Sequence, residues 1–286
     1  MHMENEQVIG IDLGGTQVRA GIVTEKTVTN LVSGLIPSTE TVERVLEVLY
    51  QHVDALVSKS TKAIGIGVPS VVDTEKGIVY DVRNIPSWKE VALKDLMEER
   101  YHLPVFVNND ANCFALAEKH FGQGQQAQSM IGLTIGTGLG SGIIINEKLF
   151  GGVNCGAGEF GEIDYLDHNY EYYASGQFFS NCYNKSGKDV FKKAQAHDKQ
   201  ALAIFEEFGT HLGNVIKMIL YSYDPKMIIL GGSIRDAYSL FEKTMWQRIH
   251  TFSYPKSLEH FQLGVSKLEA SGVLGAASLY YDQQRS

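Results

Sequence analysis

The sequence predicts an α/β protein of two domains that are related by an internal duplication. Short apolar runs of strand type alternate with segments whose apolar residues recur at helical spacing. A glycine-rich turn joins two strand-like runs near the N-terminus, and a second such turn lies at 136–142. The 286 residues are enough for two modest domains with their own cores. Because each half of the chain begins with a glycine-rich turn between strands, the sequence indicates an internal duplication.

Composition and charge exclude several classes of protein. Charged residues make up 20% and hydrophobic residues 44%, as in an ordinary globular chain. The formal net charge of -8 argues against a broad nucleic-acid surface, and no apolar run is long enough to span a membrane. The cysteines Cys113, Cys155 and Cys182 are too widely spaced for a disulfide framework. We therefore expect a cytoplasmic protein without nucleic-acid or membrane partners.

The first glycine-rich turn, Gly14-Gly15-Thr16, lies between the predicted strands 8–13 and 18–23. Glycines in such a turn let backbone N–H groups approach an anion closely. Asp12 is suited to hold Mg²⁺ through water, and Thr16 to donate to a phosphate. The alternative is an ordinary hairpin in which the glycines only supply positive φ.

The next segments predict a helix over 40–58 and a buried strand over 63–68 that ends at Pro69. The loop 84–88 follows with Asn84, a candidate substrate ligand, and Trp88, which we expect to be exposed. Trp88 is suited to wall a sugar site, although a lone tryptophan is more often a packing residue.

The candidate catalytic residue is Asp110. The apolar run 105–107 predicts a buried strand and 111–118 predicts a helix, so Asn109 and Asp110 lie where the strand ends. Ligands of open α/β sheets bind at such strand ends, and a carboxylate there is well placed to act as a general base. The alternative is that Asp110 only caps the helix that follows it.

The second turn contains Gly136, Thr137 and Gly138, between predicted strands at 130–135 and 143–145. Its spacing is not that of a dinucleotide fingerprint, and a strand rather than a helix follows it. The chain also lacks the G-x-x-x-x-G-K-[ST] pattern of a P-loop. We interpret the turn as a second copy of the first phosphate cradle.

Two further glycine-flanked segments are candidates. Residues 151–176 are expected to form a loop, in which Glu159 lies between glycines that imply tight backbone geometry. Gly231 and Gly232 follow the predicted strand 227–230 and open the next helix, where backbone can approach the adenosine part of a nucleotide.

Together these residues resemble the ROK family of bacterial sugar kinases, within the superfamily of sugar kinases, Hsp70 and actin. The resemblance runs almost from end to end and includes five motifs in the family's order. They are Asp12-Leu13-Gly14-Gly15-Thr16, Asn109-Asp110-Ala111-Asn112, Leu133-Thr134-Ile135-Gly136-Thr137-Gly138, Gly158-Glu159-Phe160-Gly161 and Ile229-Leu230-Gly231-Gly232.

The resemblance implies an actin-like ATPase (ribonuclease H-like) fold with duplicated mixed sheets and an interdomain cleft. It implies a small N-terminal domain, 1–108, to which the last helix, 273–286, returns, and a large domain, 109–272. It also implies ATP and Mg²⁺ as cofactors, a hexose substrate and a homodimer.

By position, Asp110 resembles the base that takes the proton of the sugar hydroxyl. Asn109 and Glu159 resemble ligands of sugar hydroxyls, and Glu171 resembles the residue that reaches the anomeric end of the sugar. Asn84 and Glu162 complete the expected sugar site, and the glycine turns are expected to hold ATP.

The chain departs from the family between Gly161 and Glu171. Many members have a histidine after this glycine and a cysteine-rich segment that binds zinc, whereas here Glu162 follows and the segment is missing. We therefore expect no structural zinc, with the loop held by packing of Tyr165, Tyr170, Tyr172, Tyr173 and Phe178. The alternative is that Cys155, His168 and Cys182 converge with a carboxylate to bind a metal.

These features predict an ATP-dependent hexose kinase of glucokinase type that acts on a 6-hydroxyl. The alternatives within the family are an N-acetylmannosamine kinase and a β-glucoside kinase. A sugar-responsive repressor is a more distant alternative, because repressors of this family carry an N-terminal helix-turn-helix domain and the first strand is expected at Val8. A nucleotide switch of the actin type is the last alternative.

Overall fold

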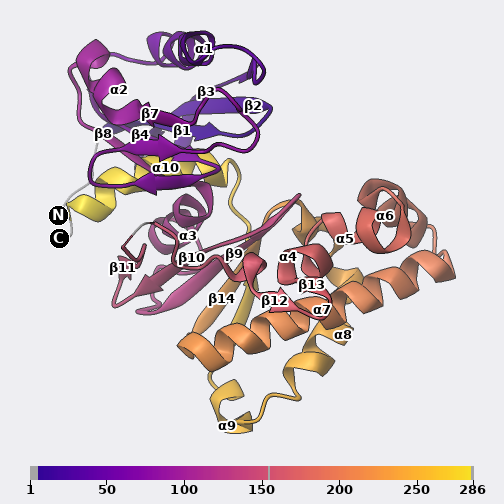
Figure 1. Cartoon of the computed structure of the whole chain (residues 1–286). Helices are drawn as coiled ribbons and strands as arrows, with labels where there is room; N and C mark the ends of the chain where they lie inside the picture. The colour runs from indigo at the N-terminus through magenta and orange to yellow at the C-terminus, as the bar shows by residue number, and fades with distance from the viewer. Residues whose placement is uncertain (1–5, 154, 285–286) are drawn as a thin grey trace. The chain divides into compact units, whose positions relative to one another are not determined.

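The computed structural model describes residues 6–153 and 155–284, and the chain forms two compact units (Figure 1). Unit 1 comprises Met1–Gln126, Gly142–Ala157 and Lys267–Ser286, and unit 2 comprises Ala127–Ser141 and Gly158–Ser266. The chain contains two five-stranded mixed sheets. All strands of the first lie in unit 1, whereas the second has β9, β14, β15 and the start of β10 in unit 2 and the rest of β10 with β11 in unit 1.

The sheet of unit 1 has the order β3-β2-β1-β4-β8. The strands are β1 (Gln7–Leu13), β2 (Gln17–Thr24), β3 (Thr27–Leu35), β4 (Thr61–Val68) and β8 (Val105–Asn109). β1, β2 and β3 are antiparallel neighbours, whereas β1, β4 and β8 run parallel. The carboxyl ends of these three parallel strands therefore meet at one edge of the sheet.

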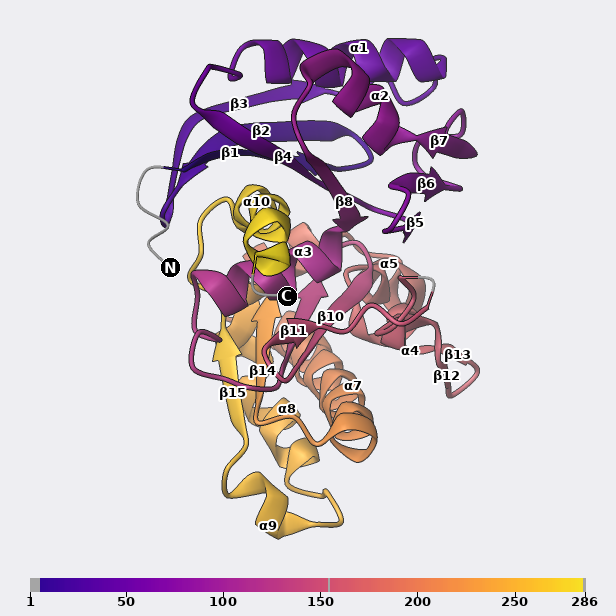
Figure 2. The ribbon, with the colours of Figure 1, turned by 90° about the vertical axis from the view of Figure 1, so that its left-hand side faces the viewer.

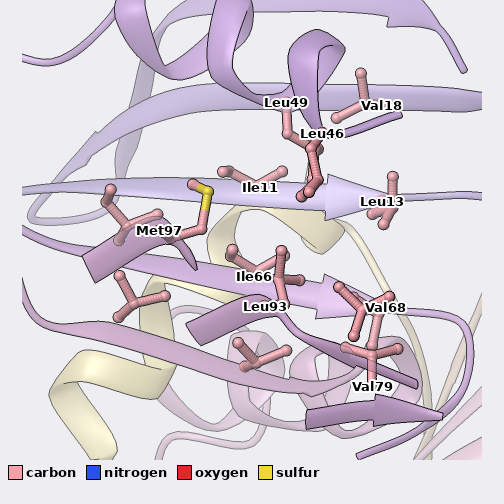
Figure 3. Packing of buried hydrophobic residues seen from close by; sticks show 14 of the residues in the cluster. Ile11, Leu13, Val18, Leu46, Leu49, Ile66, Val68, Val79, Leu93 and Met97 are labelled. Atoms are coloured by element: carbon pink, nitrogen blue, oxygen red, sulfur yellow. The ribbon is translucent and has the colours of Figure 1, made fainter. Parts of the chain in front are cut away.

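Helices cover both faces of this sheet (Figure 2). α1 (Val42–Asp54) and α2 (Leu93–Tyr101) pack on one face, and α3 (Asp110–His120) and α10 (Ser271–Gln283) pack on the other. Leu46 and Leu49 of α1 lie among strand residues such as Ile11 and Ile66 (Figure 3). The apolar residues whose spacing predicted this helix form the buried face of α1.

α10 approaches the sheet so closely that two glycines are needed beneath it. A Cβ added to Gly10 would lie 2.1 Å from the carbonyl oxygen of Val273, and one added to Gly65 would lie 1.9 Å from that of Ala276. The strands lose no packing there, because the helix backbone occupies the space of the missing side chains. The last helix, α10, packs on the sheet of unit 1, where it was expected to lie.

A small sheet of β5 (Val71–Asp73), β6 (Ile78–Tyr80) and β7 (Glu90–Ala92) belongs to the same unit. The loop before β7 carries Trp88, which is fully buried in the core, so the expectation of an exposed ring was wrong. Tight turns fold this loop inward, and one of them is closed by a hydrogen bond from Trp88 N–H to Ile85 O (2.8 Å). Trp88 therefore acts as a packing residue.

The second sheet repeats the order of the first. Its order is β11-β10-β9-β14-β15, with bounds β9 (Met130–Ile135), β10 (Leu139–Ile145), β11 (Lys148–Leu149), β14 (Met227–Gly231) and β15 (Gln262–Val265). β9, β14 and β15 run parallel, as β1, β4 and β8 do, and β10 and β11 are antiparallel, as β2 and β3 are. The predicted internal duplication is confirmed.

In unit 2, the long helix α7 (Lys199–Tyr223) packs on α8 (Tyr238–Ile249). The side chain of Asp198 caps α7 by accepting a hydrogen bond from Ala201 N (2.8 Å). The remaining elements of unit 2 are η1 (Phe160–Glu162), β12 (Asp164–Tyr165), β13 (His168–Asn169), α4 (Tyr170–Ala174), α5 (Gln177–Tyr183), α6 (Gly187–Gln195), η2 (Ser233–Ala237) and α9 (Pro255–Leu258). The segment expected to be a loop, 151–176, thus contains short helices and strands, because its tyrosines pack on α7.

The division into units follows packing rather than the sequence boundary expected after Asn108. α3 lies on α10, where a Cβ on Gly275 would come within 2.0 Å of the carbonyl oxygen of Cys113. The structure accordingly groups residues up to Gln126, and the segment Gly142–Ala157, with the N-terminal unit.

Within the described ranges, none of the helices combines the length and the apolar character that crossing a bilayer requires.

Candidate active site

The predicted site residues of unit 1 gather at the carboxyl edge of its parallel strands. Asp12 of β1 pairs with Gly67 of β4, and Gly67 pairs with Asn108 of β8. A Cβ on Gly67 would lie 3.7 Å from the Cα of Asp110. Burial raises the pKa of the Cys113 thiol, and the carboxylates of Asp110 and Asp12 raise it further. Asp12 and Asp110 therefore lie close to one thiol at one sheet edge.

Asp110 is the first residue of α3, and its neighbour Asn109 is the helix cap. The Asn109 Oδ1 accepts hydrogen bonds from Ala111 N (2.9 Å) and Asn112 N (3.3 Å). The alternative in which Asp110 serves only as the cap was therefore wrong. The Asp110 carboxylate accepts from Ala111 N (2.8 Å) and its residue is exposed, so it lies at the positive end of the helix with a face toward solvent.

Asn109, an expected sugar ligand, also stabilises the local fold. Besides capping α3, its Nδ2 donates to Ser70 O (3.3 Å), which ties the helix start to the segment after β4. An asparagine Nδ2 carries two N–H groups, so the second one can donate to a ligand. Capping explains why an amide stands before the candidate base.

Replacing Asn109 by alanine should lower the free energy of unfolding by about 1 kcal/mol, the usual cost of a lost N-cap. Thermal unfolding should show a decrease in Tm of about 2–4 °C for a domain of this size. Asn109→Asp is the matched control, because its carboxylate retains the acceptor for both N–H groups. A Tm of Asn109→Ala equal to that of the wild type would contradict the cap.

A buried network behind the site was missed in the sequence. Asn108 Oδ1 accepts from Asn109 N (2.8 Å), Asn112 Nδ2 (3.0 Å) and Cys155 Sγ (3.1 Å). Asn112 Oδ1 is buried without a hydrogen-bond partner in the part of the chain that the structure describes. The available signal was the pair of asparagines four residues apart, at 108 and 112, around the predicted base.

The first glycine turn is shaped by close approach and not by positive φ. Gly14 N donates to Gln17 O (2.8 Å), and neither Gly14 nor Gly15 has positive φ. A Cβ on Gly15 would lie 2.5 Å from Asn84 Nδ2, so Asn84 lies against the turn. The positive-φ alternative for this turn was wrong, and Thr16, at its tip, is exposed.

Asp12 is a carboxylate in a partly buried position. Burial raises its pKa from the ordinary value of 3.8, and the nearby Arg19 partly offsets this effect. Gly272 makes room for it, since a Cβ there would lie 2.3 Å from Asp12 Oδ2. A buried carboxylate whose charge is costly is well suited to gain from a divalent cation.

In unit 2, the second turn is bound to Glu171. Gly136 N donates to Gly138 O (3.0 Å), which closes the turn around Thr137. Glu171 Oε2 accepts from Leu139 N (3.0 Å), and Oε1 accepts from Gln177 Nε2 (2.9 Å). Both carboxylate oxygens of the expected anomeric ligand thus have partners within unit 2.

Glu159 and Glu162 lie on a segment attached to the start of β10. Ser141 Oγ donates to the carbonyl oxygen of Gly158 (2.6 Å), whose φ of 97° favours glycine. A Cβ on Gly161 would lie 2.7 Å from Leu139 O. The tight geometry expected around Glu159 is confirmed. Both acids are exposed, and Asn169 Nδ2 donates to Glu162 Oε2 (3.3 Å).

The last glycine pair follows β14. Gly231 pairs with Thr134 of β9, and Gly232 has a φ of 79° with no room for a Cβ, which would lie 2.3 Å from Ile135 O. The 3₁₀ helix η2 lies between this glycine pair and α8. The α-helix therefore begins later than expected, and not directly after Gly232.

Aromatic packing holds the short loop of unit 2, as predicted. Tyr165 stacks on Tyr170 with ring centroids 4.4 Å apart and meets Tyr173 edge to face at 5.7 Å. The ring of His211 on α7 packs against Tyr165 (5.7 Å) and Phe178 (5.6 Å). The rings of Tyr172 and Tyr173 lie 4.8 Å apart.

Within the residues described, no group of three or more His, Cys, Asp or Glu side chains is arranged to hold a metal ion. The absence of structural zinc stays a prediction: metal analysis of purified protein should find far less than one zinc per chain, and chelators should leave Tm unchanged. Stoichiometric zinc whose removal lowers Tm would contradict it. An unrelated zinc protein purified in parallel serves as the positive control.

The predicted residues divide between the two units. Unit 1 holds Asp12, Gly14, Gly15, Thr16, Asn84, Asn109 and Asp110, and unit 2 holds Gly136, Thr137, Gly138, Glu159, Glu162, Glu171, Gly231 and Gly232. Within each unit a glycine turn at the first hairpin of the sheet lies beside an acidic residue.

Comparison with known proteins identifies the family. The ROK family profile matches residues 8–283. A glucokinase of Halalkalibacterium halodurans is 28% identical over 99% of this chain and 98% of its own length. A xylose repressor of Bacillus subtilis is 30% identical over 77% of this chain and 61% of its own length. The crystal structure of a ROK family glucokinase from Streptomyces griseus in complex with glucose and AMPPNP superposes with a TM-score of 0.81 at 29% identity, over 96% of this chain and 98% of that one.

The predicted fold class is confirmed by these findings. The two mixed α/β sheets with equivalent strand order form the actin-like ATPase fold of the ROK kinase structures. Because the family match covers all but the ends of the chain, the protein belongs to the ROK family.

Proposed function

We propose that the protein is an ATP-dependent sugar kinase that transfers the γ-phosphoryl group of ATP to the 6-hydroxyl of a glucose-type hexose. The observation that carries the proposal is that two neighbouring residues at the start of α3 have different roles. Asn109 caps the helix, so the exposed carboxylate of Asp110 is not needed for that purpose. Likeness to glucokinases, one of them a complex with glucose and AMPPNP, supports the same reaction.

In this proposal Asp110 accepts the proton of the sugar hydroxyl as its oxygen forms a bond to the γ-phosphorus. The bond from that phosphorus to the bridging oxygen breaks, and ADP leaves with the electron pair. Positioning and charge stabilisation supply most of the catalysis in such transfers. Asp110 lies at the N-terminus of α3, a position where the helix dipole stabilises a negative charge.

Nucleotide and metal fit the residues present. Backbone N–H groups of Gly14, Gly15 and Thr16 in unit 1, and of Gly136 to Gly138 in unit 2, would hold phosphates. Asp12 would hold Mg²⁺, which as a hard cation takes carboxylate and water oxygens. The ion, when bound, would neutralise charge that develops on the phosphate oxygens. Gly231 and Gly232 would face the adenosine.

Sugar recognition would rest on Asn109, Glu159, Glu162 and Glu171, with Asn84 nearer to the first phosphate turn. Carboxylates and amides select a sugar by pairing with particular hydroxyl orientations, and an unpaired buried group rejects the wrong epimer. Glu162 stands where many relatives have histidine, so its acceptor character should alter preference at one hydroxyl. N-acetylmannosamine and β-glucosides such as cellobiose are therefore the alternative substrates.

A coupled assay of ADP release over glucose, mannose, N-acetylmannosamine, N-acetylglucosamine, fructose, allose and cellobiose tests the proposal. We expect one or two sugars to stimulate ATP turnover in the presence of Mg²⁺. Light scattering of the same preparation tests the proposed homodimer. ATP turnover that no sugar of the panel stimulates would remove the kinase proposal.

A sugar-responsive regulator is the second candidate, because the xylose repressor is as similar in identity as the glucokinases. A regulator would bind sugar without ATP turnover. Calorimetric sugar binding combined with an inactive coupled assay would favour it.

A further inference from the structure

Glu171 of α4 and Gly176, the residue before α5, hold the second glycine turn at two points. Gly176 N–H donates to Gly136 O at 2.7 Å, and Leu139 N–H donates to Glu171 Oε2 at 3.0 Å. Both approaches are tight: a Cβ on Gly176 would lie 2.5 Å from Gly136 O, and one on Gly138 would lie 2.6 Å from Glu171 Oε2. The turn is therefore fixed to α4 and α5 on either side of Thr137.

The Glu171 carboxylate is itself held in one orientation. Gln177 Nε2, on the first residue of α5, donates to Glu171 Oε1 at 2.9 Å. The helix that carries Glu171 is anchored by the stacking of Tyr170 on Tyr165 at 4.4 Å, and Asn214 Nδ2 donates to the Tyr165 hydroxyl at 2.7 Å. The carboxylate thus connects the turn to α7 through a continuous set of contacts.

Such a connection matters because a backbone N–H binds phosphate strongly only when its peptide plane is already oriented. A charge-assisted acceptor on Leu139 N–H fixes the last peptide of the turn, and preorganised donors need no rearrangement when the anion arrives. We propose that Glu171 is a positioning residue for the turn Gly136-Thr137-Gly138 and thereby sets the affinity for nucleotide phosphates. The inference rests on the proposed function and adds to the sugar contact that the family resemblance implies for this residue.

Two substitutions of similar shape separate the acceptor from the charge. Glu171→Gln retains a carbonyl for Leu139 N–H, and the Gln177 amide can turn to pair with it, whereas Glu171→Met retains neither. The dissociation constant of magnesium AMPPNP, measured by titration calorimetry without sugar, should rise about tenfold in Glu171→Met, as for a lost charge-assisted hydrogen bond. It should stay within about threefold of wild type in Glu171→Gln. Glu206→Met, at an exposed position of α7, is the matched control.

A second pair of variants tests the same contact through the supporting residue. Gln177→Glu places a like charge beside Glu171 Oε1 and should weaken AMPPNP binding by several-fold, on the order of one lost hydrogen bond. The exchange Glu171→Gln with Gln177→Glu restores the amide–carboxylate pair and should restore nucleotide affinity. Thermal unfolding and circular dichroism confirm that each variant is folded.

The outcomes are separable. AMPPNP binding by Glu171→Met at wild-type strength, or binding by Glu171→Gln as weak as that of Glu171→Met, overturns the positioning role. A double exchange no better than Gln177→Glu also counts against it. Wild-type protein that binds no AMPPNP removes the proposed kinase function instead, so the two failures are distinguished.

Discussion

Replacing Asp110 by asparagine is expected to lower kcat by about a thousandfold or more, because the proton of the sugar hydroxyl loses its acceptor. The substitution preserves shape and the hydrogen bond from Ala111 N, which donates to Asp110 Oδ1 at 2.8 Å. Since Asn109 remains the cap of α3, the fold should be unaffected. Steady-state kinetics with the sugar that the panel identifies will measure the loss.

Nucleotide binding separates a lost base from a damaged site. Magnesium AMPPNP should bind the Asp110→Asn variant with nearly wild-type affinity, and Tm should change little. Asp54→Asn serves as the matched control, because Asp54 is exposed at the end of α1 and pairs with Arg100 (2.9 Å). Turnover of Asp110→Asn within tenfold of wild type would remove Asp110 from the proton transfer.

The second large effect is expected at Asp12. Asp12→Asn should lower kcat/KM for ATP by about a hundredfold, the usual cost of removing one group that stabilises transition-state charge. The same variant should be more stable than wild type at neutral pH, because burial raises the pKa of the Asp12 carboxyl and makes its charge costly. Loss of activity combined with a gain in Tm is the signature of a charge retained for function.

The stability gain has a defined pH dependence. With the folded pKa above the ordinary value of 3.8, the folded state retains the proton more strongly than the unfolded state. Rising pH therefore destabilises the wild type between these two values, and the penalty persists at higher pH. The Tm difference between variant and wild type, measured with a chelator present, should be positive at pH 7 and vanish as pH falls below about 3.8. A variant less stable than wild type at pH 7 would contradict the burial argument.

Periodic sequence features predicted much of the fold. The strand runs of β1, β4 and β8 and the helical stripe of α1 depend on local spacing, which a single sequence reveals. The two glycine turns were placed correctly because each lies between two recognisable strands. Asp110 was located for the same reason, since a strand end and a helix start leave few positions between them.

Other features depend on packing between distant segments and could not be predicted. Trp88 is buried because its loop folds back onto the core of unit 1, and no local pattern indicates this. Cys155 donates to Asn108 across 47 positions of sequence. Asn and Asp are both common N-cap residues, so the sequence could not show which of Asn109 and Asp110 caps α3. The role of Gly15 follows from Asn84, which lies far along the chain.

The equal strand order of the two sheets has a consequence for the ancestry of the site. Two residues before the first glycine of its turn, unit 1 has Asp12, whereas unit 2 has Thr134, whose hydroxyl donates to Gly140 O at 3.2 Å. The copies have therefore diverged at this position: unit 1 has an anionic side chain there, and unit 2 has a neutral hydroxyl. The carboxylate beside the second turn, Glu171, instead accepts hydrogen bonds from Leu139 N and Gln177 Nε2. A triphosphate is rich in negative charge, so a carboxylate at position 134 would repel it unless a second cation came with it. Divergence at this one position makes the two glycine turns chemically unequal, so in the proposed kinase only the turn of unit 1 would bring a carboxylate for the metal.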